Sequence, residues 1–370
     1  MPPAGPQEEP GRQKNKNNGK GLGMVDRAAG VVERGAAAAP KGLIARSIDP
    51  GATRALRRSP AAEGPGPGPV ARMEPQALGP VRVGHALELL RALPDQSVHL
   101  IATDPPYFID GMGDSWDKGR LDARTKRADV VGGLPVGMKF DPKQARAFAA
   151  FMAPIAVEAM RVLKPGGFFI AFSQARLYHR LASAVEDAGF EMRDMLAWRY
   201  EGQAKAFGMD HLVSRLDLPE DLARQILENI GGRKTPQLKP QLEPMTLAQK
   251  PREGTFVENW LAHETGLVDT TASLDGKFPG NVMEVGKPSK AERGAGNDHP
   301  TVKPVALMEH LITLFSAPGQ LVLDPFVGSG TTGVAAANTG REFLGFEIEP
   351  AYARIARARI AQAIAERGER

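Results

Sequence analysis

Residues 321–332 read LVLDPFVGSGTT, a short apolar stretch that turns through small residues into a helical pattern. Parallel sheets bind nucleotide-like ligands at such a strand end, because glycines let the backbone approach the ligand closely. The spacing Gly328-x-Gly330-x-x-Gly333 also satisfies the dinucleotide fingerprint, so a nicotinamide-dependent dehydrogenase stays open as an alternative. The next apolar stretch ends at Glu347, which is placed to accept hydrogen bonds from ribose hydroxyls. The stretch predicts a ligand site at the edge of a parallel sheet.

A second apolar strand, at residues 98–102, leads into Asp104-Pro105-Pro106-Tyr107. A side-chain carboxylate and a rigid backbone carbonyl can accept hydrogen bonds from an exocyclic amine, and two prolines lack the amide hydrogens that would repel such a donor. The aromatic ring that follows can stack on the flat base that carries the amine. The alternative is an ordinary turn after a strand, because Asp and Pro are common turn residues.

The rest of the chain from about residue 80 alternates between helical and strand patterns. The predicted helices are 86–93, 142–163, 175–188, 303–315, 330–339 and 350–367. The predicted strands are 98–102, 168–172, 192–199, 321–323 and 343–346. Lys164-Pro165-Gly166-Gly167 is expected to end the second helix with a basic last turn and breakers. This alternation predicts an α/β fold with a mainly parallel, doubly wound sheet.

Two segments depart from the pattern. Residues 1–79 are predicted to be a disordered basic arm, since they are rich in Pro, Gly, Ala and Arg without apolar periodicity. Two interpretations of this arm stay open: it adds non-specific affinity for DNA, or it is a tail without a folded role. A third is that translation starts at Met73. Residues 201–298 are predicted to be an irregular insertion with one sheet strand at 245–248. They separate a first half of the domain, 80–200, from a second, 299–370.

Composition narrows the function classes. The chain has 370 residues, no cysteine and a net charge of +4, whose positive excess falls in residues 1–75. The absence of cysteine excludes a disulfide framework, a thiolate nucleophile and a Cys-based zinc site, and no metal is expected. No apolar run reaches the ~18 residues of a membrane span. We therefore expect an intracellular, cytoplasmic protein.

Residues 299–304 read HPTVKP and directly precede a helix. Thr301 and Lys303 at a helix start suit an amino-acid carboxylate, because free amide hydrogens there already favour anions. The alternative for His299 is a structural or solvated side chain. The charged stretch 111–141, which includes Trp116, is expected either to close over DNA or cofactor or to be a solvated loop.

Taken together, these motifs resemble the β group of DNA amino-methyltransferases, which use S-adenosylmethionine (AdoMet) and place the catalytic motif before the cofactor motif. The resemblance covers about residues 82–367, and it includes KPQLEP at 239–244 and FEIEPAY at 346–352. It implies a circularly permuted, Rossmann-like methyltransferase sheet in which 201–298 is the target-recognition insertion. It also implies double-stranded DNA as partner, a homodimer as one option, and a bacterial or phage source.

The resemblance assigns roles to individual residues. The implied catalytic residues are Asp104, Pro105, Pro106 and Tyr107. The implied AdoMet residues are Thr301, Lys303, Asp324, Phe326, Gly328, Gly330, Thr331 and Glu347. Asp at the first position of the tetrapeptide favours N6-adenine as target, and Ser there is the commoner sign of N4-cytosine. The target base is expected to flip out of the helix. An N4-cytosine enzyme and a catalytically inactive DNA-binding homologue stay as alternatives, with RNA as a more distant substrate.

Overall fold

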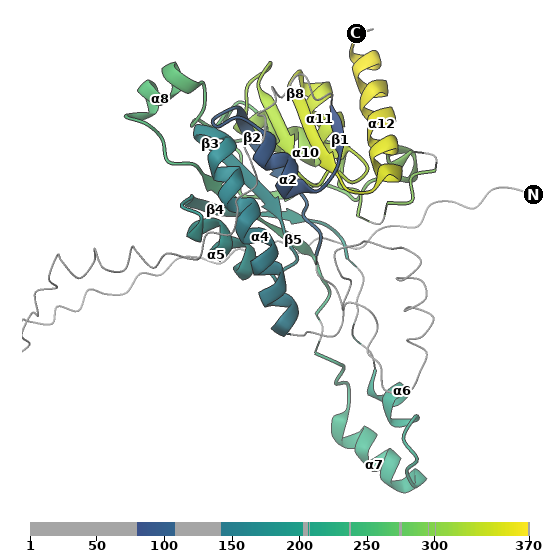
Figure 1. Ribbon diagram of the computed structural model, residues 1–370. Coiled ribbons are helices and arrows are strands. Elements are labelled where there is room, and N and C mark those ends of the chain that lie inside the picture. The colour runs from purple at the N-terminus through teal and green to yellow at the C-terminus, as the bar shows by residue number, and fades with distance from the viewer. Residues whose placement is uncertain are drawn as a thin grey trace, which may run out of the picture. The chain divides into compact units, whose positions relative to one another are not determined.

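The computed structural model describes residues 80–107, 142–202, 206, 208–236, 238–273, 276–294, 296–299 and 301–368 (Figure 1). The predicted arm at 1–79 and the charged stretch at 111–141 lie outside these residues.

The described elements follow the alternation expected from the sequence. The strands are β1 (Val81–Val83), β2 (Val98–Thr103), β3 (Leu163–Phe172), β4 (Glu191–Arg199), β5 (Leu242–Gln249), β6 (Val282–Glu284), β7 (Leu321–Asp324) and β8 (Glu342–Glu347). The helices are α2 (Ala86–Ala92), α4 (Pro142–Val162), α5 (Tyr178–Asp187), α6 (Met209–Val213), α7 (Glu220–Ile230), α8 (Phe256–His263), α9 (Lys290–Arg293), α10 (Val305–Phe315), α11 (Thr331–Thr339) and α12 (Pro350–Gly368). Within the described part of the chain, no helix combines the length and apolar character needed to cross a membrane.

All eight strands form one sheet in the order β1-β8-β7-β2-β3-β5-β4-β6. The first five strands of that order run parallel to one another, as predicted. Strand β5 is antiparallel to both of its neighbours, β3 and β4, and β6 is again parallel to β4. The α/β fold is confirmed, and the sheet is mixed rather than parallel throughout.

The expected helix stop at residues 164–167 is wrong in detail. Helix α4 ends at Val162, and the KPGG segment belongs to β3, which begins at Leu163. The glycines are accommodated as a bulge, because the partner of Val98 is Leu163 and that of Leu100 is already Phe168. Gly166 takes a φ of 78°, and its N–H donates to the carbonyl of Lys250.

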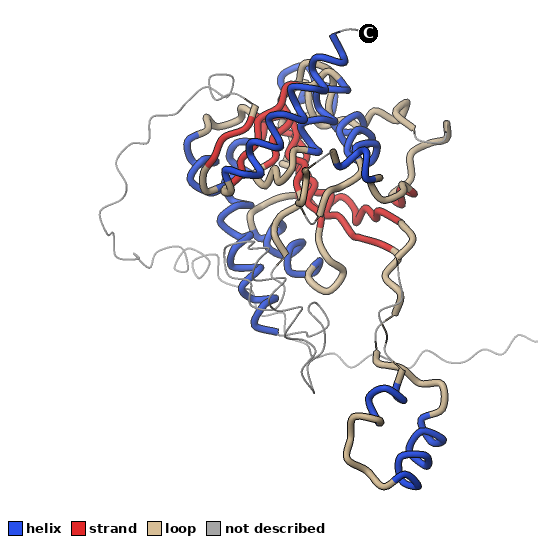
Figure 2. Tube along the Cα trace, turned by 90° about the vertical axis from the view of Figure 1, so that its right-hand side faces the viewer, coloured by secondary structure: helices blue, strands red, loops and turns tan. Residues whose placement is uncertain are grey.

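Each face of the sheet packs against its own helices, because successive side chains of a strand point to opposite sides. Helices α2, α4 and α5 cover one face, where Leu90, Met152 and Phe169 are fully buried. Helices α10 and α11 cover the other face, where Leu311 and Ile170 are fully buried. Figure 2 shows helices on both sides of the strands. A smaller cluster joins α12 to β1.

Residues 201–298 are more regular than the sequence pattern suggested. Besides the predicted strand, seen as β5, they contain β6 and the short helices α6 to α9. Helix α8 begins with a capping box, in which the Thr255 hydroxyl accepts from the Glu258 N–H and the Glu258 carboxylate accepts from the Thr255 N–H. That signal was readable in the sequence. Strand β6, with three residues, is too short for any periodicity to appear.

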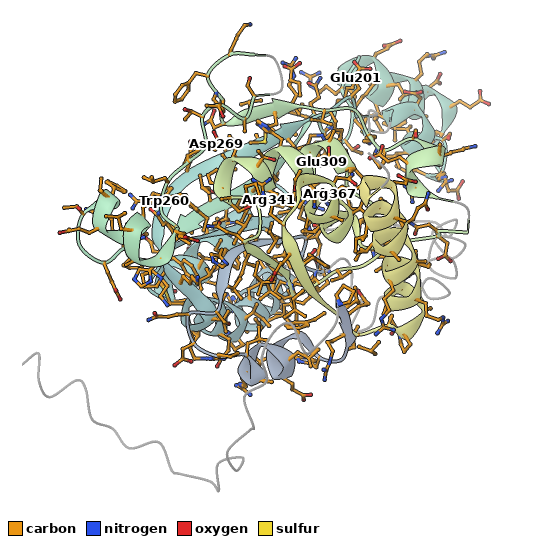
Figure 3. The ribbon with its side chains drawn as sticks, turned by 90° about the horizontal axis from the view of Figure 1, so that it is seen from above. Glu201, Trp260, Asp269, Glu309, Arg341 and Arg367 are labelled. Atoms are coloured by element: carbon orange, nitrogen blue, oxygen red, sulfur yellow. The ribbon has the colours of Figure 1, made fainter. Side chains whose placement is uncertain are left out.

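The ends of α10 and α11 are held by arginines from outside those helices. Arg341 donates to the carbonyls of Ser316, at 2.5 Å, and Thr339, at 2.6 Å. Arg367, on α12, donates to the carbonyl of Ala337 at 3.3 Å. Arg341 and Arg367 are labelled in Figure 3. Cations at helix C-termini satisfy the last free carbonyls.

Candidate active site

The two predicted motifs leave the sheet at the same edge. Strands β2 and β7 are parallel neighbours, with Leu100 opposite Val322 and Ile101 opposite Leu323. From this pair the chain continues outward in both directions, to β3 on one side and β8 on the other. The crevice at such a reversal of strand order is where open α/β sheets bind ligands.

A single cavity of about 350 Å³ opens at this edge. Both motifs line it, together with the HPTVKP segment. Eleven of the twelve predicted site residues are on its wall: Asp104, Pro105, Pro106, Tyr107, Thr301, Lys303, Asp324, Phe326, Gly328, Thr331 and Glu347. The twelfth, Gly330, is not on the wall. The fold therefore brings together residues that are more than 200 positions apart in the chain.

The glycine turn after β7 depends on two left-handed residues. Gly328 has a φ of 54° and Gly330 a φ of 88°. A Cβ on Gly328 would lie 2.8 Å from Nε2 of His299, and one on Gly330 would lie 2.8 Å from Cα of Ala356 in α12. Gly328 thus leaves room at the cavity wall, whereas Gly330 lets α12 pack against the turn.

Asp324, the last residue of β7, is a buried carboxylate with three donors. Its Oδ1 accepts from the Thr103 hydroxyl at 2.5 Å and from the Phe326 N–H at 3.0 Å, and its Oδ2 accepts from the Thr332 hydroxyl at 2.6 Å. Burial raises the pKa of Asp324 from 3.8 to about 6, although these donors oppose the rise. The carboxylate therefore ties β2, the glycine turn and α11 to one point.

Glu347 ends β8 and faces the same turn. Its two oxygens accept from the N–H groups of Gly328, at 2.8 Å, and Glu349, at 2.9 Å. Burial raises its pKa, and the two backbone donors oppose that change. A carboxylate has about four lone-pair sites, so the side chain keeps acceptor capacity for hydroxyl groups in the cavity.

The Asp104–Tyr107 tetrapeptide is part of a compact polar cluster. Asp104 accepts from Nζ of Lys303 at 2.5 Å and from the hydroxyl of Tyr107 at 2.6 Å, on different oxygens. Glu243, which lies on β5, is 2.8 Å from Nζ of Lys303 and 2.7 Å from the Tyr107 hydroxyl. The four side chains come from three distant parts of the sequence.

Lys303 lies deep in this cluster, with its side chain only 8% exposed. Burial alone would lower its pKa, but Asp104 and Glu243 together raise the pKa above the usual lysine value. Its ammonium therefore stays charged. The sequence led us to expect Lys303 to hold an amino-acid carboxylate; in the structure its ammonium pairs with two protein carboxylates.

The His299 ring lies against the glycine turn, beside Gly328. Its ring meets Tyr352 edge-on, with the centroids 4.7 Å apart. Burial, reinforced by Lys303 and Arg293, lowers the pKa of His299 to about 4. The imidazole is thus neutral at physiological pH, and it lines the cavity rather than pointing into solvent.

Sequence reasoning missed several wall residues. They are Gly84, His85, Ala86, Phe151 and Phe172, together with Ile348, Glu349 and Tyr352, which belong to the FEIEPAY motif but had been given no role. Phe172 could have been found, because it ends the strand beside β2 and so reaches the same edge. Gly84 to Ala86 follow a three-residue strand that leaves no pattern. Glu243 was noticed within the KPQLEP motif, but its contact with Tyr107 and Lys303 required the sheet order.

The donor set fits AdoMet. A volume of about 350 Å³ lies within the range of small-molecule sites. The wall offers carboxylates at Asp324 and Glu347, and aromatic rings at Phe326 and Tyr352. The ribose hydroxyls and the amino group of such a ligand would find hydrogen-bond acceptors on this wall. Its positively charged sulfonium would lie near negative charge.

Comparison with known proteins agrees with this geometry. The profile of a protein family described as DNA methylase, with the short name N6_N4_Mtase, matches residues 98–358. That range contains the catalytic tetrapeptide, the HPTVKP segment and the glycine turn.

Individual relatives point the same way. The chain is 29% identical over 282 residues to the Type II methyltransferase M.HindIII of Haemophilus influenzae, covering 70% of this chain and 87% of that protein. It is 27% identical over 276 residues to the Type II methyltransferase M2.DpnII of Streptococcus pneumoniae, covering 74% and 86%. The solved PvuII DNA methyltransferase (cytosine-N4-specific) is similar in fold, with 19% identity, a TM-score of 0.50, and coverage of 77% of this chain and 91% of that one.

Proposed function

This chain belongs to the DNA methylase family and is an AdoMet-dependent DNA methyltransferase, and we propose that it methylates the exocyclic N6 of adenine at specific sites in double-stranded DNA. The observation that supports this proposal is the shared cavity. Asp104 and Pro105, the acceptors for an amine, line the same 350 Å³ space as the glycine turn after β7. Donor and acceptor of the methyl group would therefore meet without any covalent enzyme intermediate.

The protein's part in the reaction is to position the amine. The N6 nitrogen of adenine is a poor nucleophile, because its lone pair is delocalised into the ring. Hydrogen bonds from its two hydrogens to the Asp104 carboxylate and the Pro105 carbonyl would favour a tetrahedral nitrogen whose lone pair points into the cavity. AdoMet, when bound, would supply an electrophilic methyl group and retain on its sulfur the electron pair of the sulfur–methyl bond. Asp104 then takes the proton that the methylated nitrogen must lose. Positioning supplies much of the rate.

The cofactor would be held by residues on the other wall. Glu347 has acceptor capacity left for the ribose hydroxyls, and the Gly328 turn lets the backbone approach the ligand. Asp324 would fix the position of that turn through its contacts with Thr103 and Phe326. Thr301 remains placed for the methionine end. Lys303 would act mainly on Asp104, its partner at 2.5 Å.

The target base would enter flipped out of the duplex, because a base that stays paired cannot reach the bottom of this cavity. Unpairing costs a few kcal/mol, which stacking on Tyr107 and contacts from 201–298 would offset. The preference for adenine rests on Asp, rather than Ser, at position 104. The likeness to two Type II methyltransferases supports a modification enzyme of a restriction system as the biological role.

The test is methyl transfer to mixed-sequence DNA with labelled AdoMet, followed by mass spectrometry of the nucleosides. N6-methyladenine is the expected product. N4-methylcytosine would replace the adenine assignment by the cytosine alternative, and label in neither base with undiminished AdoMet binding would indicate a non-catalytic DNA-binding protein. Asp104→Ala should bind AdoMet as the parent does and transfer no methyl group at a measurable rate.

A further inference from the structure

Glu243 is the member of the active-site cluster that has no role in the scheme above. It lies at the start of β5, in the segment between the two halves of the methyltransferase domain. Its side chain is only 16% exposed, so its charge is poorly screened by solvent. A mostly buried carboxylate is costly unless it is paired. Its partners, Lys303 and Tyr107, are the same two groups that hold Asp104.

The Tyr107 hydroxyl has fewer hydrogens than it has carboxylate neighbours. Tyr107 has one hydroxyl hydrogen, yet its oxygen lies 2.6 Å from Asp104 and 2.7 Å from Glu243. The hydroxyl can donate to only one carboxylate at a time. When it donates to Glu243, a lone pair on Oδ1 of Asp104 becomes free for a hydrogen of the incoming amine. Without Glu243, Asp104 would be the carboxylate left to accept from this hydroxyl among the residues that the structure describes.

The net charge of the cluster also depends on Glu243. Asp104, Glu243 and Lys303 sum to −1 with Tyr107 neutral, whereas Asp104 and Lys303 alone would sum to zero. The nitrogen that attacks the methyl group becomes positively charged in the transition state. A fixed negative cluster beside it stabilises the transition state more than the ground state, which raises kcat rather than lowering KM.

We propose that Glu243 is a positioning residue for Asp104: it takes the Tyr107 hydroxyl and shares the Lys303 ammonium, so that Asp104 can accept the target amine within a cluster of net negative charge. This rests on the proposed methyl transfer and assigns a catalytic contribution to a residue of the inserted segment. Amine positioning thus depends on a strand that packs between β3 and β4.

The experiment compares Glu243→Gln with the parent in single-turnover methylation. The amide keeps an acceptor for Tyr107 but removes the charge. The expected loss in rate is about 100-fold, the size seen when one group that stabilises transition-state charge is removed. AdoMet affinity by calorimetry and the KM for DNA should not change. Glu284→Gln is the matched control, since Glu284 forms an exposed pair with Arg199 on a nearby strand, and it should keep the parental rate.

Two further readouts exclude a merely structural role. The Lys303 ammonium, followed by NMR in nitrogen-labelled protein, should titrate at lower pH in Glu243→Gln, because one of its two carboxylate partners has lost its charge. In a double-mutant cycle with Tyr107→Phe, the cost of Glu243→Gln should be smaller than in the parent, since both act on Asp104.

The outcomes are separable. A parent chain without methyl transfer to any DNA would end the proposed function itself. An active parent with an equally active Glu243→Gln would overturn the Glu243 inference alone. A slow Glu243→Gln with weakened AdoMet binding, or with an unchanged Lys303 titration, would also overturn it. Glu243→Asp, which keeps the charge on a shorter side chain, should recover part of the rate.

Discussion

The Thr103 hydroxyl donates a hydrogen bond of 2.5 Å to Oδ1 of Asp324, and this bond links the two ends of the active site. Thr103 immediately precedes the tetrapeptide Asp104–Tyr107, and Asp324 begins the glycine turn. Both residues are at least 98% buried. A shift of either strand relative to the other would break the bond, so it sets the spacing between the groups proposed to hold the amine and those proposed to hold the cofactor.

Thr103→Val should therefore weaken AdoMet binding. Valine has nearly the same shape but no donor, and loss of one hydrogen bond to a charged group costs about 1.5–3 kcal/mol. Part of that cost should appear in calorimetry as a lower affinity and part as a lower free energy of unfolding. The control is Thr313→Val on α10, which removes a hydroxyl bonded only to a helix carbonyl. Equal affinities in parent and Thr103→Val would contradict the linking role.

The free energy of unfolding of Asp324→Asn, relative to that of the parent, should be higher at pH 8 than at pH 5. The pKa of Asp324 is raised from 3.8 to about 6 in the folded protein, mainly by burial. A group whose pKa is raised on folding contributes stability that is fully present below its unfolded pKa, here pH 3.8. That contribution is lost as the pH rises through the folded pKa of about 6. The asparagine does not titrate. The free energy of unfolding of the variant minus that of the parent should therefore increase by about 1 kcal/mol between pH 5 and pH 8. Denaturant unfolding at the two pH values measures this, and a pH-independent difference would contradict it.

Gly330→Ala should destabilise the fold by more than Gly319→Ala. Both glycines have a positive φ, 88° and 80°, so both substitutions introduce backbone strain of about 1 kcal/mol or more. A Cβ at Gly319 meets nothing within 4 Å, whereas one at Gly330 lies 2.8 Å from the backbone of α12. The difference between the two denaturation midpoints isolates the steric part. Equal midpoints would mean that α12 can move away at no cost.

His99 should make the protein less stable as the pH falls from 6.5 to 4. Burial, and then the charge of Lys164, lowers the pKa of His99 to about 4. A depressed pKa contributes stability that is present above 6.5 and is lost as the pH falls towards 4. Nδ1 of His99 accepts a hydrogen bond from the Leu321 N–H, and protonation of Nδ1 would remove that acceptor. His99→Gln should flatten the dependence of the unfolding free energy on pH in this window.

Several relationships were readable from the residues alone. The alternation of patterns predicted the α/β class, because buried parallel strands and amphipathic helices have different apolar periods. The order of the strand, glycines and helix at 321–339 predicted the ligand edge. The KPGG segment led to a wrong prediction of a helix end. Its glycines form a bulge inside a strand that has partners on both sides.

The sequence by itself determined the class of fold, the two motifs and eleven of the residues on the cavity wall, because each of those depends on local pattern and chemical type. Only the tertiary structure decided that Glu243 and Lys303 meet at Asp104, and that Gly330 supports α12 instead of the cavity. The physical reason is strand order. Pairing β5 between β3 and β4, and β2 beside β7, joins residues whose separation in the chain hides their contact.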